Sequence, residues 1–464
     1  MNQSSVDLSR GSVGKLLFSL ALPSILAQVI NVLYNMVDRV YIGHIEGVGP
    51  ASLTGVGVCM PIIMAVSAFA ALVCMGGAPR AAICLGQQDH EGAEKILSSC
   101  FSLLLVLALA LTVSVEVWGA DLLRMFGASE QTLPYGWAYL QIYALGTVFV
   151  QLALGLNAFI NTQGYAKWGM FSVGIGAILN IVLDPILIFV LDMKVAGAAV
   201  ATVISQGVSA LFCLWFLRSR HSYLHLRRKY MRLSWRVLAP CLLLGLSPFV
   251  MQITESLISI CFNSSLQRYG GDTAVGAMAI LASVMQFSML PLQGMTQGSQ
   301  PIISYNFGAG KFARIRQTFR ILLIVCLLYS ATLWALCEFA PGLFAGMFTS
   351  DEELFAFTCR MLRIYMAGQI VFGAQIACQQ TFIALGNAKT SLFLAVLRKI
   401  ILLIPLIYLL PFFVNSAPEK TLMVFMAEPV ADLLAVATTV TLFASFYKRV
   451  LSGPEKDGLP STIA

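Results

Sequence analysis

The sequence predicts an all-α polytopic membrane protein in which twelve transmembrane helices form two pseudo-symmetric six-helix lobes. Three observations support this fold class. Of the 464 residues, 58% are hydrophobic and 11% are charged, whereas about a quarter of the residues of a soluble domain are charged. Lysine and arginine gather in alternate loops, and two pairs of segments repeat at one fixed separation. Hydrophobicity along the whole chain excludes a soluble protein with a single membrane anchor.

Polar and Gly/Pro clusters divide the chain into apolar segments of about twenty residues or more, the length that spans a bilayer. The first dozen residues are polar and no small-residue cleavage site follows the first apolar segment, so we expect no cleavable signal peptide. The twelve expected spans are 14–43, 51–76, 94–117, 133–160, 167–190, 195–217, 236–262, 274–298, 317–340, 357–384, 390–413 and 420–447.

The distribution of basic residues predicts the topology. If the N-terminus is cytoplasmic, 20 lysines and arginines fall in cytoplasmic segments and 6 on the outer side, as the positive-inside rule requires. We therefore expect a multi-pass protein of the cell membrane with both termini in the cytoplasm. Seven of the 20 lie between residues 218 and 236. We interpret this loop as a topology signal and expect no nucleic-acid partner, despite a net charge of +7.

An internal repeat predicts the domain organisation. Residues 143–168 align without gaps to residues 365–390, and residues 76–86 align to 298–308 with the same offset of 222. We expect an N-terminal lobe over 1–217, a basic cytoplasmic linker over 218–235 and a C-terminal lobe over 236–464. An even number of helices in each lobe makes the two lobes parallel. Such repeats occur in many secondary transporters, which bind substrate between the halves.

A polar stripe runs along the first expected helix. Its members are spaced by three or four residues and therefore share one helical face. A stripe facing lipid would leave its polar groups unpaired, so it must face protein or a wet cavity. The stripe consists of Gln28, Asn31, Asn35 and Asp38.

The fourth to sixth expected spans supply further oxygen atoms. Asn180 and Asp184 lie four residues apart on one face, and Pro185 follows directly and removes a backbone donor. Asn157 shares a face with Asn161, and Thr202 adds a hydroxyl.

Two buried carboxyl groups in one lobe can do either of two jobs. A buried Asp beside a second carboxylate can carry a proton at ordinary pH. Alternatively, Na⁺ can bind to oxygen atoms of Asp38, Asn180, Asp184 and Thr202. A third interpretation is that the aspartates only link helices by hydrogen bonds, although intramembrane carboxylates are usually functional.

The second lobe contains candidates for substrate binding. Gln252 and Glu255 mirror the stripe of the first helix, and Glu255 could attract a cationic substrate or carry a second proton. The alternative for each candidate is ordinary interhelical packing. Glu428 and Asp432 share a face of the last span, either as a site or as a pair with Arg398 or Lys399. The full set of substrate-binding candidates is Glu255, Gln252, Asn35, Asn31, Gln28, Tyr34, Gln375, Gln379 and Met36.

Enzyme motifs are absent from the sequence. The segment "GAGK" (308–311) has Tyr305 where a P-loop needs glycine, and Phe312 where it needs serine or threonine. The four histidines lie in expected loops or helix ends, and no C-x-x-C pair occurs. We expect no enzyme activity and no cofactor other than a coupling cation, H⁺ or Na⁺, and we expect the 11 cysteines to be free thiols.

Two segments resemble the multidrug and toxic compound extrusion (MATE) family of transporters. They are "LALPSILAQVINVLYNMVDRVYIGHI" (20–45) and "ILNIVLDPILIF" (178–189). The resemblance implies a V-shaped, two-lobed bacterial multidrug exporter. In one branch of the family the ion-coupling residues match Asp38, Asn157, Asn180, Asp184 and Thr202. Glu255 resembles the seventh-helix glutamate of another branch.

The expected function is secondary active multidrug efflux by alternating access, an activity that confers antibiotic resistance. H⁺ or Na⁺ would enter and organic, often cationic, compounds would leave, with the first helix bending near Pro23. We expect a monomer in the lipid bilayer. The alternative is a lipid-linked precursor flippase of the same wider superfamily, which would need a strongly cationic cavity.

Overall fold

A computed structural model describes residues 7–451, and this part of the chain is helical without a strand. The helices of the first half are α1 (Val13–Gly43), α2 (Gly49–Gly86), α3 (His90–Met125), α4 (Leu133–Leu145), α5 (Thr147–Thr162), α6 (Ala166–Pro185), η1 (Ile186–Val190) and α7 (Lys194–Arg218). Those of the second half are η2 (Arg228–Tyr230), α8 (Trp235–Gly308), α9 (Phe312–Phe339), α10 (Pro341–Ala345), α11 (Glu352–Tyr365), α12 (Gln369–Ala384), α13 (Ala388–Val396), η3 (Leu397–Leu403), α14 (Ile404–Leu409), η4 (Leu410–Phe413), α15 (Ala417–Phe446) and η5 (Tyr447–Leu451).

The number of spans agrees with the sequence prediction. Within residues 7–451, 9 helices are long and apolar enough to cross a membrane, or up to 11 if the bent pairs α4–α5 and α11–α12 each count as one span. The 74-residue α8 counts once there, but it changes direction at Gly271, where φ is 63°. Both of its ends pack against α2, so α8 is a hairpin of two spans. Counting both halves gives the predicted twelve.

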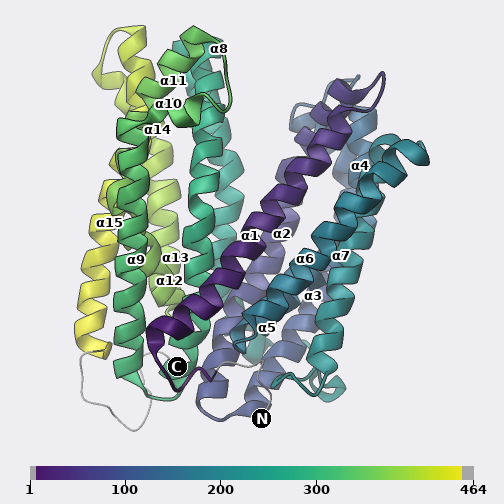
Figure 1. Cartoon of the computed structure of the whole chain (residues 1–464), viewed down its shortest axis with the longest axis vertical. Helices are drawn as coiled ribbons and strands as arrows, with labels where there is room; N and C mark the ends of the chain where they lie inside the picture. The colour runs from purple at the N-terminus through teal and green to yellow at the C-terminus, as the bar shows by residue number, and fades with distance from the viewer. Residues whose placement is uncertain (1–6, 452–464) are drawn as a thin grey trace.

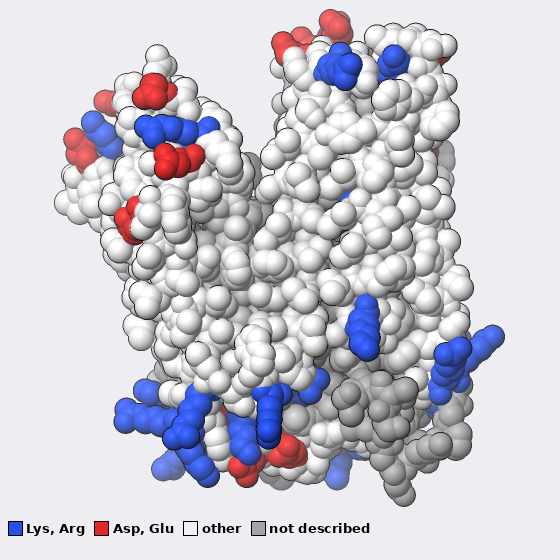
Figure 2. Space-filling view, turned by 180° about the vertical axis from the view of Figure 1, so that it is seen from behind, with Lys and Arg blue, Asp and Glu red and all other residues white. Residues whose placement is uncertain are grey.

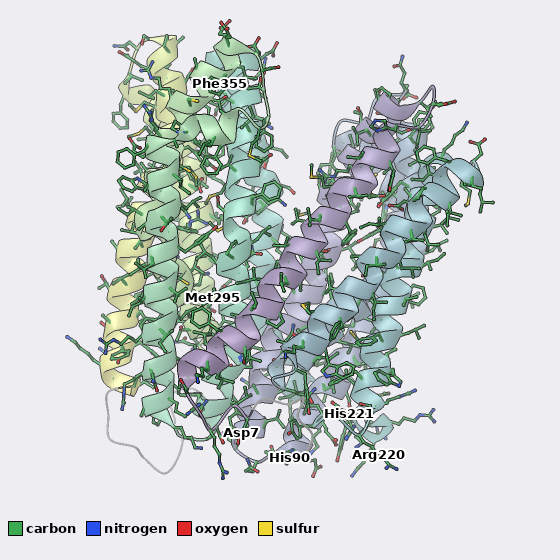
Figure 3. All side chains as sticks on the ribbon, in the orientation of Figure 1. Asp7, His90, Arg220, His221, Met295 and Phe355 are labelled. Atoms are coloured by element: carbon green, nitrogen blue, oxygen red, sulfur yellow. The ribbon has the colours of Figure 1, made fainter. Side chains whose placement is uncertain are left out.

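The helices form two bundles that diverge toward one end (Figure 1). The first bundle contains α1 to α7 and the second contains α8 to α15. Each has its own apolar core, with Phe159 and Phe216 buried in the first and Phe262 and Phe425 in the second. The bundles converge at the end where Asp7, His90 and Arg220 lie, while Phe355 marks the opposite end (Figure 3).

Lysine and arginine side chains gather where the bundles converge, whereas acidic and basic side chains mix at the opposite end (Figure 2). We call the converging end the basic end and the opposite end the open end. The linker 219–234 lies at the basic end and is fixed to α3, because Arg227 pairs with Glu94 at 3.1 Å and the Tyr230 hydroxyl donates to Glu91 at 2.9 Å.

Glycines let the two bundles approach closely near the basic end. A Cβ atom at Gly86 of α2 would overlap with the carbonyl oxygen of Tyr305 of α8, and one at Gly308 would overlap with that of Ile83. These two contacts are related by the 222-residue repeat. Small residues allow such backbone contacts between membrane helices, so α2 and α8 close the basic end of the molecule.

The segment before α1 adds a second connection between the bundles. Asn306 of α8 donates to the carbonyl oxygen of Leu8 at 3.0 Å, and Arg314 of α9 donates to that of Gly11 at 3.0 Å. Leu8 itself is buried. The chain that leads into the first bundle is therefore held by the second.

The internal repeat has structural counterparts beyond the glycine contact. Gly164 and Gly386, which the alignment pairs, both have positive φ, 87° and 76°. The α4–α5 and α11–α12 pairs bend by 58° and 50°, near the aligned Gly146 and Gly368. The repeat therefore reproduces backbone bends as well as sequence.

Candidate functional site

The first site is built where α6 ends. Pro185 closes α6 because it lacks the N–H that would continue the ladder, and the wider turn η1 follows. Asp184 and Asn180 lie on the last turns of α6 and are fully buried, with exposures of 0% and 1%. They face α1 and α7, which pack against α6.

Asp184 meets Asp38 of α1 in the interior of the first bundle. The two carboxyl groups are in hydrogen-bonding contact, although 146 residues of sequence separate them. The Asn180 amide donates to Asp184 Oδ1 at 3.3 Å and also lies 3.5 Å from the hydroxyl of Thr202 on α7. Four side chains from three helices therefore meet at one point. We call Asp38 and Asp184 the acid pair.

The acid pair and its neighbour leave three buried oxygen atoms without a donor. Asp38 Oδ1, Asp184 Oδ2 and Asn180 Oδ1 have no hydrogen-bond partner among the described residues. Buried polar atoms in native proteins nearly always have a partner. These oxygens can accept a proton between the carboxyl groups or coordinate a hard cation.

Two tyrosines complete the surroundings of the acid pair. Tyr34 of α1 lies beside Asn35 and Gln206 and is electrostatically coupled to both aspartates. The Tyr139 hydroxyl of α4 lies beside Thr202 and close to Asp38. Sequence reasoning missed Tyr139 and Gln206, because nothing in their own segments shows that they approach the acid pair.

A cavity of about 310 Å³ lies next to the site and reaches the second bundle. Its wall comes from α1, α2, α5, α6 and α7 of the first bundle and from α8 of the second. Among the described residues, none of the side chains that line it is charged. The polar side chains are Ser24, Gln28, Asn31, Tyr34, Ser67, Asn157, Asn161, Thr162, Ser172, Asn180, Thr202, Ser205, Gln206, Ser209, Gln252, Gln297 and Gln300.

The cavity contains most of the predicted first-bundle residues but not all of them. Gln28, Asn31, Tyr34 and Asn157 line it. Asn157 forms no hydrogen bond with the acid pair and instead donates to the carbonyl oxygen of Gly169 at 2.8 Å. Asn35 and Met36 are exposed and lie outside the cavity. The Asn35 amide donates back to the Asn31 carbonyl oxygen at 2.6 Å, so it is a local helical contact.

The predicted second-bundle residues are divided between two places. Gln252 lines the cavity. Gln375 and Gln379 are buried, bonded to each other at 3.3 Å, and Gln379 also reaches Met251 and Ser247. They fill the interior of the second bundle and are not part of the cavity wall.

Glu255 belongs to a network of charged groups inside the second bundle. Lys399 Nζ lies 2.5 Å from Glu255 Oε1. Arg398 pairs with Glu428 at 3.0 Å and with Asp432 at 2.7 Å. Glu428 and Asp432 are thus paired with Arg398, one of the two arrangements left open by the sequence. We call these five residues the charged network.

Comparison with known proteins places this geometry in a family. The family profile MatE matches residues 23–186 and 248–409. The multidrug export protein MepA of Staphylococcus haemolyticus is 24% identical over 399 residues, which cover 86% of this chain and 87% of the relative. MepA of Staphylococcus aureus is also 24% identical, over 404 residues covering 86% and 88% of the two chains.

Solved structures share the fold at low identity. An outward-facing multidrug resistance MATE family transporter of the MOP superfamily matches with a TM-score of 0.89 and 21% identity, over 98% of this chain and 100% of that one. A MATE structure in the bent conformation matches with a TM-score of 0.86 and 22% identity, over 95% and 98%. These matches confirm the predicted fold class.

Proposed function

Because this chain belongs to the MatE family of transporters, which are not enzymes, we propose that it is an antiporter that exports organic compounds in exchange for an entering cation. The similarity to MepA of two Staphylococcus species, which is named as a multidrug export protein, supports efflux of several compounds. The coupling ion and the substrates belong to the proposal.

The observation that carries the proposal is the acid pair with its unpartnered oxygens beside an uncharged polar cavity. In this arrangement Asp38 and Asp184 bind the coupling ion, while Asn180 and Thr202 fix the geometry of Asp184. Intramembrane carboxyl groups that face a cavity are typical of ion and proton pathways. The neighbouring cavity binds the substrate through amide and hydroxyl groups such as those of Gln28, Asn31 and Gln252.

The arrangement seen here favours a proton as the bound ion. Two carboxyl groups in contact are stabilised by a proton held between them, since two carboxylates would repel each other. Na⁺ is the competing choice, with ligands from Asp38, Asn180, Asp184 and Thr202. In either case substrate and ion compete through charge, which is the differential affinity that alternating access requires.

The basic end faces the cytoplasm in this proposal. The positive-inside rule puts the lysine- and arginine-rich end there (Figure 2). The bundles then diverge toward the outside, and the structure corresponds to the state that releases substrate. We place the protein in the cell membrane as a monomer with cytoplasmic termini. Its uncharged cavity wall does not favour the strongly anionic substrate of a lipid-linked precursor flippase.

Asp38→Asn is expected to abolish drug resistance in an exporter-deficient host, because the amide cannot take up the coupling ion. Asp121→Asn, at an exposed acid on α3, is the matched control and should retain resistance. Membrane expression of both variants should equal that of the wild type. Full resistance in the Asp38 variant would contradict the role given to the acid pair.

The function itself is tested in proteoliposomes with purified wild-type protein. Dye efflux is followed after a proton gradient or a Na⁺ gradient is imposed separately. Acceleration by one gradient identifies the coupling ion. Equal, gradient-independent dye movement under both conditions would refute antiport and indicate a passive pathway.

A further inference from the structure

The charged network joins three elements of the second bundle. Glu255 lies on α8, Arg398 and Lys399 on η3, and Glu428 and Asp432 on α15. Four of the five residues are buried, with residue exposures of 3% to 6%. Glu255 is the exception, because its side chain is 56% exposed. The network therefore reaches the surface through one carboxylate.

Glu255 faces the same side of α8 as the cavity wall. Gln252 lines the cavity, and Glu255 follows three residues later, on the same helical face. The chain runs from the basic end toward Gly271 along this half of α8, so Glu255 lies about one turn nearer the open end. A substrate that leaves the cavity toward the open end passes this carboxylate.

Arg398 is held too firmly to exchange its partners. It donates to both Glu428 and Asp432, and its guanidinium lies 4.5 Å from the ring centre of Phe372. A planar guanidinium with two carboxylate partners and an aromatic face is fixed in orientation. Arg398 therefore acts as a permanent counter-ion for the α15 acids.

Lys399 is bound by a single partner. Glu255 Oε1 is the one acceptor found for its three donors among the described residues. The charge of Lys399 also acts on Glu428, so a second carboxylate lies within electrostatic range. Its flexible stem can rotate between acceptors. Arg398 and Lys399 both lie in η3, which is a π-helical segment. This geometry is rare but frequent at functional sites.

The charges of the network do not balance. Three carboxyl groups face two cations, and Tyr365 of α11 is the further titratable group in electrostatic contact with them. If Lys399 leaves Glu255, it can join Glu428 without creating an unpaired buried ammonium. The exposed carboxylate of Glu255 is then free to hold another cation.

We propose that Lys399 is a tethered counter-ion that occupies Glu255 when no substrate is present, and that the ammonium group of an organic cation displaces it toward Glu428. This inference rests on the proposed export of organic compounds and specifies that these compounds are cations. Glu255 is the docking group for the cation, and Lys399 is its intramolecular competitor. The competition keeps Glu255 neutralised while no substrate is bound and allows the cation to leave when Lys399 returns.

Binding of ethidium to purified full-length protein tests this proposal. The dissociation constant is measured by fluorescence polarisation at fixed pH and low salt. Lys399→Met removes the competitor, so ethidium should bind about tenfold more tightly. Glu255→Gln removes the docking group and should weaken binding about tenfold. In the double variant, Lys399→Met should no longer increase the affinity.

Controls separate a charge effect from misfolding. Lys399→Arg keeps the charge and forms a stronger, two-pronged pair with a carboxylate, so it should weaken ethidium binding in a well-folded protein. Lys448→Met and Glu353→Gln, at exposed positions, should leave binding unchanged. All variants must elute as single species in size-exclusion chromatography and melt as one transition.

The proposal is overturned if Glu255→Gln binds ethidium like the wild type, if Lys399→Met binds it no more tightly, or if the wild type does not bind it. The proposed function has a separate readout, which is wild-type efflux in cells and proteoliposomes. If wild-type efflux is observed but the Glu255 variants bind ethidium normally, the tethered counter-ion proposal is refuted and the antiporter proposal is not affected.

Discussion

Asn180 determines how Asp184 is presented to Asp38. Its side-chain nitrogen donates to Asp184 Oδ1, while its side-chain oxygen Oδ1 is one of the buried atoms without a partner among the described residues. One side chain therefore both orients a carboxylate and offers a further ligand. A hydrogen bond to a charged group contributes about 1.5–3 kcal/mol, so its loss should be measurable in ion affinity.

Asn180→Ala is expected to weaken the affinity for the coupling ion by about ten- to a hundredfold. The ion concentration for half-maximal dye efflux from proteoliposomes should rise by that factor. Asn161→Ala is a suitable control, because Asn161 also lines the cavity but bonds to Asn157 and not to the acid pair. An unchanged half-maximal concentration in Asn180→Ala would mean that this amide does not support the ion site.

Spacing along a helix predicted which residues share a face in the candidate site, whereas packing between helices determines which other residues join them. Asn180 and Asp184 share a face because they are four residues apart, which the sequence displays directly. The approach of Tyr139 to Thr202 depends on how α4 packs against α7, and no local pattern encodes that. The same limit explains why the partner of Glu255 was not anticipated. Lys399 is 144 residues away in the chain and meets it only through the fold.

Among the helices, α2 and α8 determine whether the basic end is closed. Their contact uses Gly86 and Gly308 in a nearly symmetric arrangement in which each glycine meets the opposite backbone. Any side chain larger than hydrogen must push the two helices apart there. In the proposed alternating-access cycle, this contact is a point at which the distribution between open and closed states can be shifted.

Gly86→Val should loosen the basic end, because the branched side chain cannot fit beside the Tyr305 carbonyl group. Hydrogen–deuterium exchange measured by mass spectrometry should show faster exchange in segments 83–90 and 303–312. Gly57→Val is the control, since open space surrounds a Cβ atom at Gly57 of the same helix. Equal protection of both segments in the wild type and Gly86→Val would argue against this role of the contact.

Gly271 allows α8 to reverse direction. With φ at 63° and ψ at −158° it occupies a region open to glycine almost alone. Gly271→Ala should lower the stability of the protein by about 1–3 kcal/mol, seen as a lower melting temperature in detergent. Because no atom lies within 4 Å of a Cβ there, the cost is in the backbone. A melting temperature equal to that of Gly57→Ala would contradict this explanation.

The spans could be predicted because a helix must satisfy its own backbone in lipid, so apolar length alone reveals it. The interruptions could not be predicted. The expected segments 133–160 and 357–384 are each broken into two helices bent by 58° and 50°. Such bends depend on what the neighbouring helices allow. The repeat alignment nevertheless pairs the glycines at which they occur.

At the scale of the molecule, the two bundles carry different charged systems. The first contains the acid pair, and Arg39 is the one basic group among the described residues that acts on it electrostatically. The second contains the charged network with two basic groups. In our proposals the first binds the coupling ion, and the second binds an organic cation through Glu255. The cavity wall is uncharged, so in our proposal the substrate meets charged groups only beside the cavity.

The two-lobed form follows from the repeat and the topology signal, both visible in the sequence. The degree to which the bundles diverge does not follow from it. The divergence depends on how α2 packs against α8, and composition does not encode that packing. In this structure the basic end is closed. The segment from Leu8 to Gly11 also connects the two bundles there.

The most direct test of the central claim measures ion release when substrate binds, without any transport. Ethidium is added to purified protein in weakly buffered solution, and released protons or radioactive Na⁺ are counted per dye bound. The account predicts release of at least one ion by the wild type and by Asp121→Asn, and none by Asp38→Asn or Asp184→Asn. Release of the same amount by the two acid-pair variants would contradict the assignment of ion coupling to Asp38 and Asp184.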